Sequence, residues 1–233
     1  VITQNPSAGT AVYHPSGRLG DISLSGGEVN VPGFWVWDNT SLSLQVPGGT
    51  YTCLFIPNDG NNYEFVETQV NVTVSKAEPY VKTVSPTAIT YGEALSDSAL
   101  SGTAQYSSND TTAVSGTFQW ADNTVKPSVS DSGKTWYDVI FTPDDTANYK
   151  TAAGRARLTV NKADHPAEMP PESISVPYSV ETVSDQILRD VNISNWSFAS
   201  NDQGKKLSVG TPKTLNAVYN GADAGNFNTE TVQ

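Results

Sequence analysis

The sequence contains very little cysteine, methionine or positive charge. One Cys and one Met occur among 233 residues, and 13 Lys and Arg stand against 24 Asp and Glu, for a net charge of −11. The single cysteine, Cys53, excludes an intrachain disulfide. Without a basic stripe we expect no nucleic acid partner and no docking on an anionic membrane surface. No apolar run is long enough to cross a bilayer, so we expect no membrane insertion in this segment.

Residues that favour helices are also scarce, whereas Ser, Thr, Asn and Val are abundant. The apolar fraction of 37% is sufficient for small cores, and 18 Gly and 14 Pro are spread along the chain as turns require. The composition therefore predicts an all-β protein.

One phrase of the sequence is repeated. Phe55–Tyr63 returns as Phe141–Tyr149 and, more loosely, as Tyr219–Phe227, and each copy has Asp and Asn between two aromatic residues. This spacing indicates three tandem units of about 80 residues. We expect modules at 1–76, 77–163 and 164–233, the third divergent and truncated at its last strand.

Strand patterns align in the same way in the three copies. Aromatic residues two positions apart share one face of a strand and are expected in the core. The three pairs are Trp35/Trp37, Phe118/Trp120 and Trp196/Phe198. Cys53 aligns with Val139 and Ala217, which predicts a buried, unreactive thiol. Six or seven short strands per copy predict a β-sandwich. The linkers Lys76–Pro79 and Lys162–Pro166 are expected to be short and stiff.

A family resemblance rests on four segments of the second copy. They are Ile89-Thr90-Tyr91-Gly92, the Gly-x-Phe-x-Trp strand Gly116–Trp120, the turn Asn148-Tyr149, and Val160-Asn161-Lys162-Ala163. Together they resemble the bacterial Ig-like repeats of the MBG type, with a Tyr-Gly signature. The first copy has Tyr13-His14-Pro15 in place of Tyr-Gly. The resemblance implies three Ig-like β-sandwich modules in an elongated array, secreted or on the cell surface of Gram-positive or gut bacteria.

Residues with the chemistry of a metal or catalytic site have simpler interpretations. The loops Asn58–Asn62 and Asp144–Asn148 are rich in oxygen ligands, but lack the spacing of a calcium site and are favoured as turns. His14 and His165 are interpreted as solvated loop residues. Most acidic residues fall in turns and linkers rather than in one cleft. We therefore expect no catalytic, cofactor-binding or metal-binding residue, and no enzyme.

Three apolar side chains break the repeat pattern and are the candidate contact residues. Trp136 is expected to point outward with Asp138 and Ile140, and Phe34 and Val36 replace residues that are polar in the other copies. Packing against a neighbouring module or a sheet edge is favoured, and ligand contact is the alternative.

The sequence thus favours a monomeric, non-enzymatic stalk segment of a bacterial surface protein or adhesin. Partners, such as a glycan or a host protein, would then bind neighbouring domains. The first alternative is a glycan- or host-protein-binding module, accessory to a larger surface protein or a polysaccharide-degrading enzyme. A second is a pilin-like adhesin with Lys-Asn isopeptide bonds.

Overall fold

The structure is a computed structural model that describes residues 1–228 and 231–232. The described part of the chain is mostly short β-strands, with one five-residue α-helix, so the prediction of an all-β protein is confirmed. The chain divides into two compact units. Unit 1 comprises residues 1–84, 101–119 and 138–155, and unit 2 comprises residues 85–100, 120–137 and 156–233.

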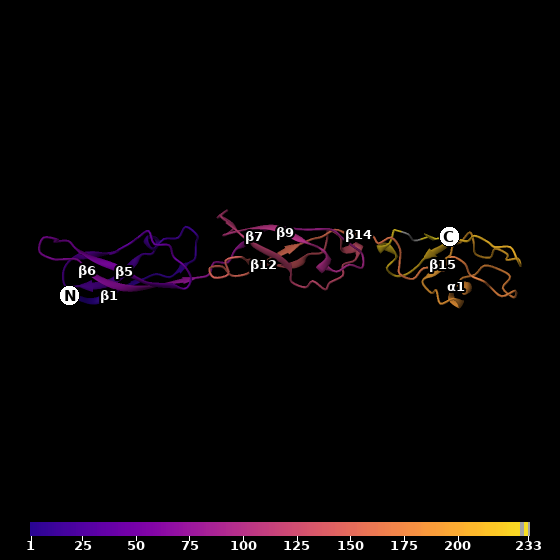
Figure 1. The fold of residues 1–233 in the computed structure, drawn as a ribbon, viewed down its shortest axis with the longest axis horizontal. Coiled ribbons are helices and arrows are strands. Elements are labelled where there is room, and N and C mark those ends of the chain that lie inside the picture. Colours follow the sequence, from indigo (N-terminus) through magenta and orange to yellow (C-terminus); the bar gives the residue numbers. More distant parts are fainter. Residues whose placement is uncertain (229–230, 233) are drawn as a thin grey trace. The chain divides into compact units, whose positions relative to one another are not determined.

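Unit 1 begins with two sheets (Figure 1). One has the strand order β2-β6-β5-β4, and the other pairs β1 with β3. The bounds are β1 Ile2–Ala8, β2 Ala11–Val12, β3 Leu24–Val29, β4 Gly33–Trp37, β5 Gly48–Pro57 and β6 Val66–Ser75. In β6, Val70, Val72 and Val74 are buried while Asn71 and Thr73 are exposed. This period of two is what a strand with one face on the core requires.

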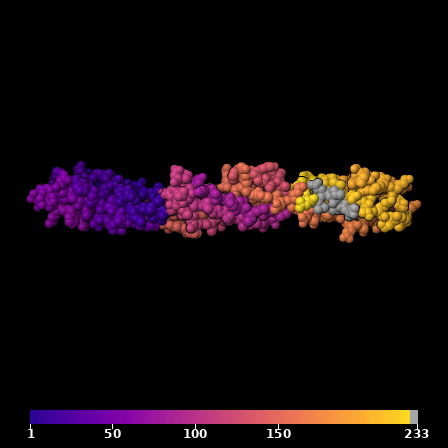
Figure 2. Space-filling view, turned by 90° about the horizontal axis from the view of Figure 1, so that it is seen from above, coloured from indigo at the N-terminus to yellow at the C-terminus, as the bar shows by residue number. Residues whose placement is uncertain are grey.

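Two more sheets lie mainly in unit 1, with the orders β10-β9-β7 and β11-β12-β13. Their bounds are β7 Tyr80–Pro86, β9 Leu100–Gln105, β10 Ala113–Val114, β11 Gly116–Trp120, β12 Tyr137–Pro143 and β13 Ala152–Ala156. One buried cluster contains residues from both pairs of sheets, including Cys53, Val72 and Phe141. On the face seen in Figure 2 the indigo and violet residues form a continuous surface.

The pairing registers agree with the alignment of the first and third copies. Trp37 lies opposite Cys53, and Phe198 lies opposite Ala217, so Cys53 and Ala217 occupy equivalent positions. Cys53 is fully buried, as predicted. Trp37, Trp120 and Trp196 are buried as well, but Trp35 is only half-buried and packs edge-on against Phe55.

The first two copies also share a short 3₁₀ turn that holds a core tryptophan. η1 (Leu19–Asp21) and η2 (Leu95–Asp97) begin in the same way, with a backbone N–H donating to the aspartate that ends the turn. The residue after each turn accepts an indole N–H: Trp37 Nε1 donates to Ile22 O at 2.7 Å, and Trp120 Nε1 donates to Ser98 O at 3.1 Å. The indole N–H groups of Trp37 and Trp120 are thereby satisfied.

Unit 2 contains a parallel pair, β8 with β14, and the sheet β15-β16-β17. Besides η2, its elements are β8 Ile89–Thr90, η3 Val129–Asp131, β14 Val160–Asn161, α1 Gln186–Asp190, β15 Trp196–Phe198, β16 Ala217–Tyr219, η4 Ala224–Asn226 and β17 Thr231–Val232. A second buried cluster, which includes Val183, Leu188 and Trp196, forms its core.

The prediction of six or seven strands per copy holds for residues 1–76, which have six, whereas residues 77–163 have eight short strands. It is wrong for the described residues after 163, which form three strands and the helix α1. Proline explains part of the difference, since Pro166, Pro170, Pro171 and Pro177 remove backbone donors before α1. The end of the third copy at Gln233 lies outside the described residues.

Candidate functional site

The predicted contact residues are divided between the two units. Trp136 is 53% exposed and points outward with Asp138 and Ile140, as predicted. The Arg157 guanidinium lies 4.1 Å from the centre of the Trp136 ring, a cation–π contact worth about 0.5–1 kcal/mol at an exposed site. Phe34, which is 54% exposed, and the half-buried Val36 lie on β4 opposite Ile56 and Leu54. Trp136 thus belongs to unit 2, and Phe34 and Val36 belong to unit 1.

The interpretation of His14 as a solvated residue is wrong. His14 Nε2 lies 2.8 Å from Asp110 Oδ2, and Ser16 donates to His14 Nδ1. The imidazole also packs edge-on against Tyr106, with ring centres 4.4 Å apart. A pairing across 96 positions leaves no local pattern in the sequence, so sequence reasoning missed it. His165 is exposed, as predicted.

The repeated Asp-Asn loops are turns that are held by hydrogen bonds from the asparagine to the aspartate of the same loop. Asn148 donates from its backbone and its side chain to the Asp145 carboxylate, at 3.1 and 2.9 Å. In the first copy the Asn62 side chain donates to Asp59 at 2.8 Å. An aspartate that caps its own loop in this way is typical of structural turns. The described residues contain no group of three or more His, Cys, Asp or Glu side chains placed to hold a metal ion.

The second copy of the phrase, Phe141–Tyr149, contacts the linker residue Ala77 within unit 1. We call this contact the first joint; it comprises Tyr13, Val46, Ala77, Asn148 and Tyr149. Tyr13 and Tyr149 pack edge to face, with ring centres 5.2 Å apart. The Ala77 N–H donates to Asn148 O at 3.0 Å, and Ala77 O accepts from Lys150 N–H at 2.8 Å. Asn148 Oδ1 accepts from the Val46 N–H at 3.0 Å. Both backbone groups of the linker alanine, its N–H and its C=O, are therefore hydrogen-bonded to the next copy.

The third copy makes the same contacts in what we call the second joint (Tyr91, Val129, Ala163, Asn226 and Phe227), within unit 2. Tyr91 and Phe227 pack edge to face at 5.4 Å. The Ala163 N–H donates to Asn226 O at 3.0 Å, and Ala163 O accepts from Asn228 N–H at 2.7 Å. Asn226 Oδ1 accepts from the Val129 N–H at 2.9 Å. Four contacts of the first joint thus recur at equivalent positions: the aromatic pair, the two backbone hydrogen bonds of the alanine, and the bond accepted by the asparagine side chain.

Burial distinguishes both joints from solvated linkers. Tyr13, Ala77 and Tyr149 belong to the buried core cluster of unit 1, with exposed fractions of 8, 2 and 6%. In unit 2 Phe227 is 7% exposed and packs with Tyr91 and Ala163. Each joint is therefore continuous with the core of its unit, and the backbone N–H and C=O of its linker alanine are paired.

Electrostatics differs between the two joints. Burial raises the pKa of Tyr149 to about 12, and the hydrogen bond to His14 lowers the pKa of the Asp110 carboxylate to about 2. In the second joint Asp223 accepts hydrogen bonds from Tyr91 at 3.2 Å and Tyr219 at 2.7 Å. The bond to Asp223 raises the pKa of Tyr219 to about 12. The first joint is thus reinforced by an imidazole–carboxylate pair, and the second by a carboxylate shared between two phenols.

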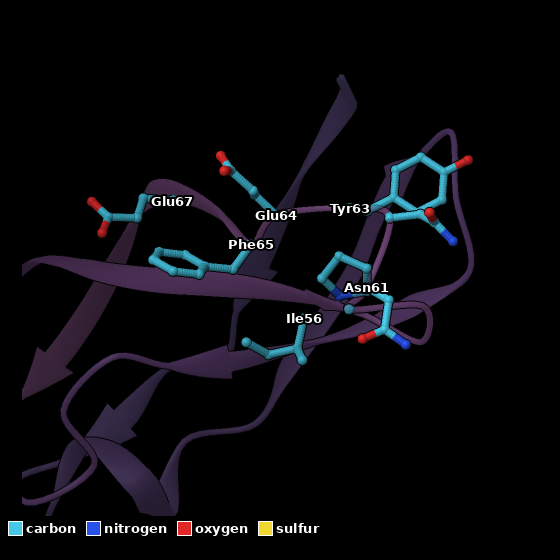
Figure 3. Close-up of a pocket in the computed structure, with 9 residues that line it drawn as sticks. Ile56, Asn61, Tyr63, Glu64, Phe65 and Glu67 are labelled. Atoms are coloured by element: carbon cyan, nitrogen blue, oxygen red, sulfur yellow. The ribbon is translucent and has the colours of Figure 1, made fainter.

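The remaining phrase, in the first copy, borders a hollow of about 970 Å³ on unit 1 (Figure 3). Asn61, Tyr63, Glu64 and Phe65 line it from the loop after β5, and Ile56 lines it from the end of β5. Tyr63 is 49% exposed and Phe65 is 59% exposed. Phe34 pairs with Ile56 across β4 and β5, but it is not one of the residues that line the hollow.

The comparisons with known proteins assign this chain to no family. No protein-family model and no curated protein matches the sequence. Among solved structures the chain is similar to extracellular domains 3–5 of Drosophila OTK, with 13% identity and a TM-score of 0.31. The match covers 70% of this chain and 62% of that structure's chain. Among the described residues no helix has the length and apolar character needed to span a membrane.

Proposed function

We propose that the chain is a non-enzymatic spacer made of three tandem Ig-like repeats at residues 1–76, 77–163 and 164–233. On this proposal it belongs to a secreted or surface-anchored bacterial protein of the MBG-repeat type, and it holds functional domains at a set distance. The motifs quoted above support the family, and the repeated joints support the mechanical role.

The observation that carries the proposal is that both joints use the same contacts. A spacer requires each linker to have one conformation, since a free linker would allow neighbouring repeats to turn. Both linker alanines are hydrogen-bonded on both sides, and both joints contain an edge-to-face aromatic pair. Such a pair contributes about 0.5–1.5 kcal/mol beyond its buried area.

Spin-label distance measurements test the mechanical role. Thr73→Cys and Thr151→Cys place labels on exposed residues on either side of the first joint, and the buried Cys53 does not compete for the label. We expect one narrow distance distribution, which broadens when Tyr149→Ala is added. A broad distribution in the protein with an intact joint would refute the spacer role.

The alternative function is a glycan- or host-protein-binding module. The hollow beside Tyr63 and Phe65 favours it, because exposed aromatic rings stack on sugar faces. A glycan array probed with the parent chain, Trp136→Ala and Phe65→Ala tests this alternative. Binding that is lost in one variant supports a glycan site at that residue, and the absence of binding by the parent chain speaks against a glycan-binding role.

A further inference from the structure

The hollow of the first copy exposes two residues whose counterparts in the second copy are buried in a joint. With an offset of 86, Asn62 and Tyr63 correspond to Asn148 and Tyr149. Asn148 and Tyr149 are 7 and 6% exposed, whereas Asn62 is exposed and Tyr63 is 49% exposed. We call Ile56, Asn62, Tyr63, Glu64 and Phe65 the open face.

The open face already has the internal geometry of a joint. Asn62 Nδ2 donates to Asp59 at 2.8 Å, just as Asn148 Nδ2 donates to Asp145 at 2.9 Å. In the first joint this bond orients the amide so that its oxygen accepts the Val46 N–H. Asn62 Oδ1 is thus held ready to accept a donor from outside, without a rotamer cost on binding.

We propose that the open face is the docking site for the linker end of another repeat of the same kind. That repeat presents three groups: an aromatic edge for Tyr63, a backbone N–H for Asn62 Oδ1, and a linker alanine that pairs with Asn62 O and the Glu64 N–H. The inference rests on the proposed spacer function and adds a partner to it.

Charge and apolar area on the open face fit this partner. Both linkers of the chain place a lysine directly before the alanine, at Lys76 and Lys162. The open face has carboxylates at its rim, from Glu64 and Glu67, and Phe65 stands where the second copy has Thr151. The positive charge of the linker lysine is attracted to the two glutamates, and docking buries apolar surface of the exposed Tyr63 and Phe65 rings.

The test is a longer chain in which residues 1–78 are placed once more directly before Val1. The added alanine then stands 64 positions before Tyr63, as Ala163 stands before Phe227 (from 163 to 227). Amide hydrogen exchange is measured by NMR at Glu64, with Lys150 and Asn228 as internal standards, because both donate to a linker alanine in the existing joints.

Docking should slow exchange of the Glu64 amide roughly tenfold or more relative to the original chain, since the amide becomes hydrogen-bonded in a buried contact. Tyr13→Ala in the added repeat alone removes the aromatic partner and leaves the open face intact. This variant should restore fast exchange at Glu64.

Equal Glu64 exchange in the longer and original chains, with Lys150 and Asn228 still protected, overturns the docking proposal alone. Unprotected Lys150 and Asn228 in the original chain overturn the spacer function itself. Cellohexaose, maltohexaose and chitohexaose serve as further probes. Protection of Glu64 by one of them, without protection in the longer chain, assigns the face to a glycan and also overturns the proposal.

Discussion

Replacing Asn148 with alanine should loosen the first joint without unfolding the protein. The change removes two hydrogen bonds across the joint, from the Val46 N–H to Oδ1 at 3.0 Å and from Nδ2 to Gln45 Oε1 at 2.8 Å. It also removes the bond to Asp145 within the loop. Each neutral bond contributes about 0.5–1.5 kcal/mol, and the exposed Gln45 lies at the low end.

Asn62→Ala is the matched control, because Asn62 makes the same bond within its loop, to Asp59. The difference between the two variants isolates the bonds across the joint, for which we expect about 1–2 kcal/mol. At about 1.4 kcal/mol per factor of ten, this corresponds to roughly 5- to 30-fold faster opening-limited exchange.

The assay is amide hydrogen exchange at Ala77 and Lys150, whose N–H groups donate across the joint. Exchange at both should accelerate in Asn148→Ala and stay unchanged in Asn62→Ala. If the two variants leave these amides equally protected, the Asn148 side chain does not hold the joint and the reasoning is wrong.

Four further predictions concern other residues. Asn226→Ala should accelerate exchange of the Asn228 amide in the second joint by a similar factor, measured in the same way. Burial raises the pKa of Tyr149 from 10.0 to about 12, so its stabilising contribution is complete below pH 10 and is lost as the pH rises toward 12; Tyr149→Phe should abolish that loss in an alkaline unfolding series. The pKa of Asp110 is lowered from 3.8 to about 2, so its contribution is complete above about pH 4 and is lost as the pH falls toward 2; Asp110→Asn should flatten this acid dependence. Burial raises the pKa of the Cys53 thiol, and its side chain is fully buried, so a thiol reagent should label Cys53 only in urea; rapid labelling of the native protein would contradict its place in the core.

Much of the fold could be predicted because it depends on local periodicity. The alternation of Val70, Val72 and Val74 identifies an inward face without knowledge of any partner strand. The same reasoning placed Cys53 inside and Trp136 outside, and both predictions are confirmed. It failed for the third copy, where the strand pattern is interrupted by prolines and by α1.

The joints could be predicted only in part. The repetition of the Lys-Ala linker and of the Asn-aromatic pair marked these residues as equivalent, but nothing in the sequence indicated that one contacts the other. Ala77 and Tyr149 are 72 positions apart (from 77 to 149), and Val46 and Asn148 are 102 positions apart. No periodic pattern extends over such separations, so the sequence predicts only the turn role of these aspartates and asparagines.

The sequence by itself determined the all-β class, the repetition and the inward and outward faces of strands, because these depend on residue type and on a period of two. Only the tertiary structure decided how the repeated phrase is used. Folding buries Tyr149 and Phe227 against the linker alanines, pairs His14 with Asp110, and leaves the equivalent Tyr63 half exposed. Similar local sequences thus differ in burial, because burial depends on which distant residues the fold places against them.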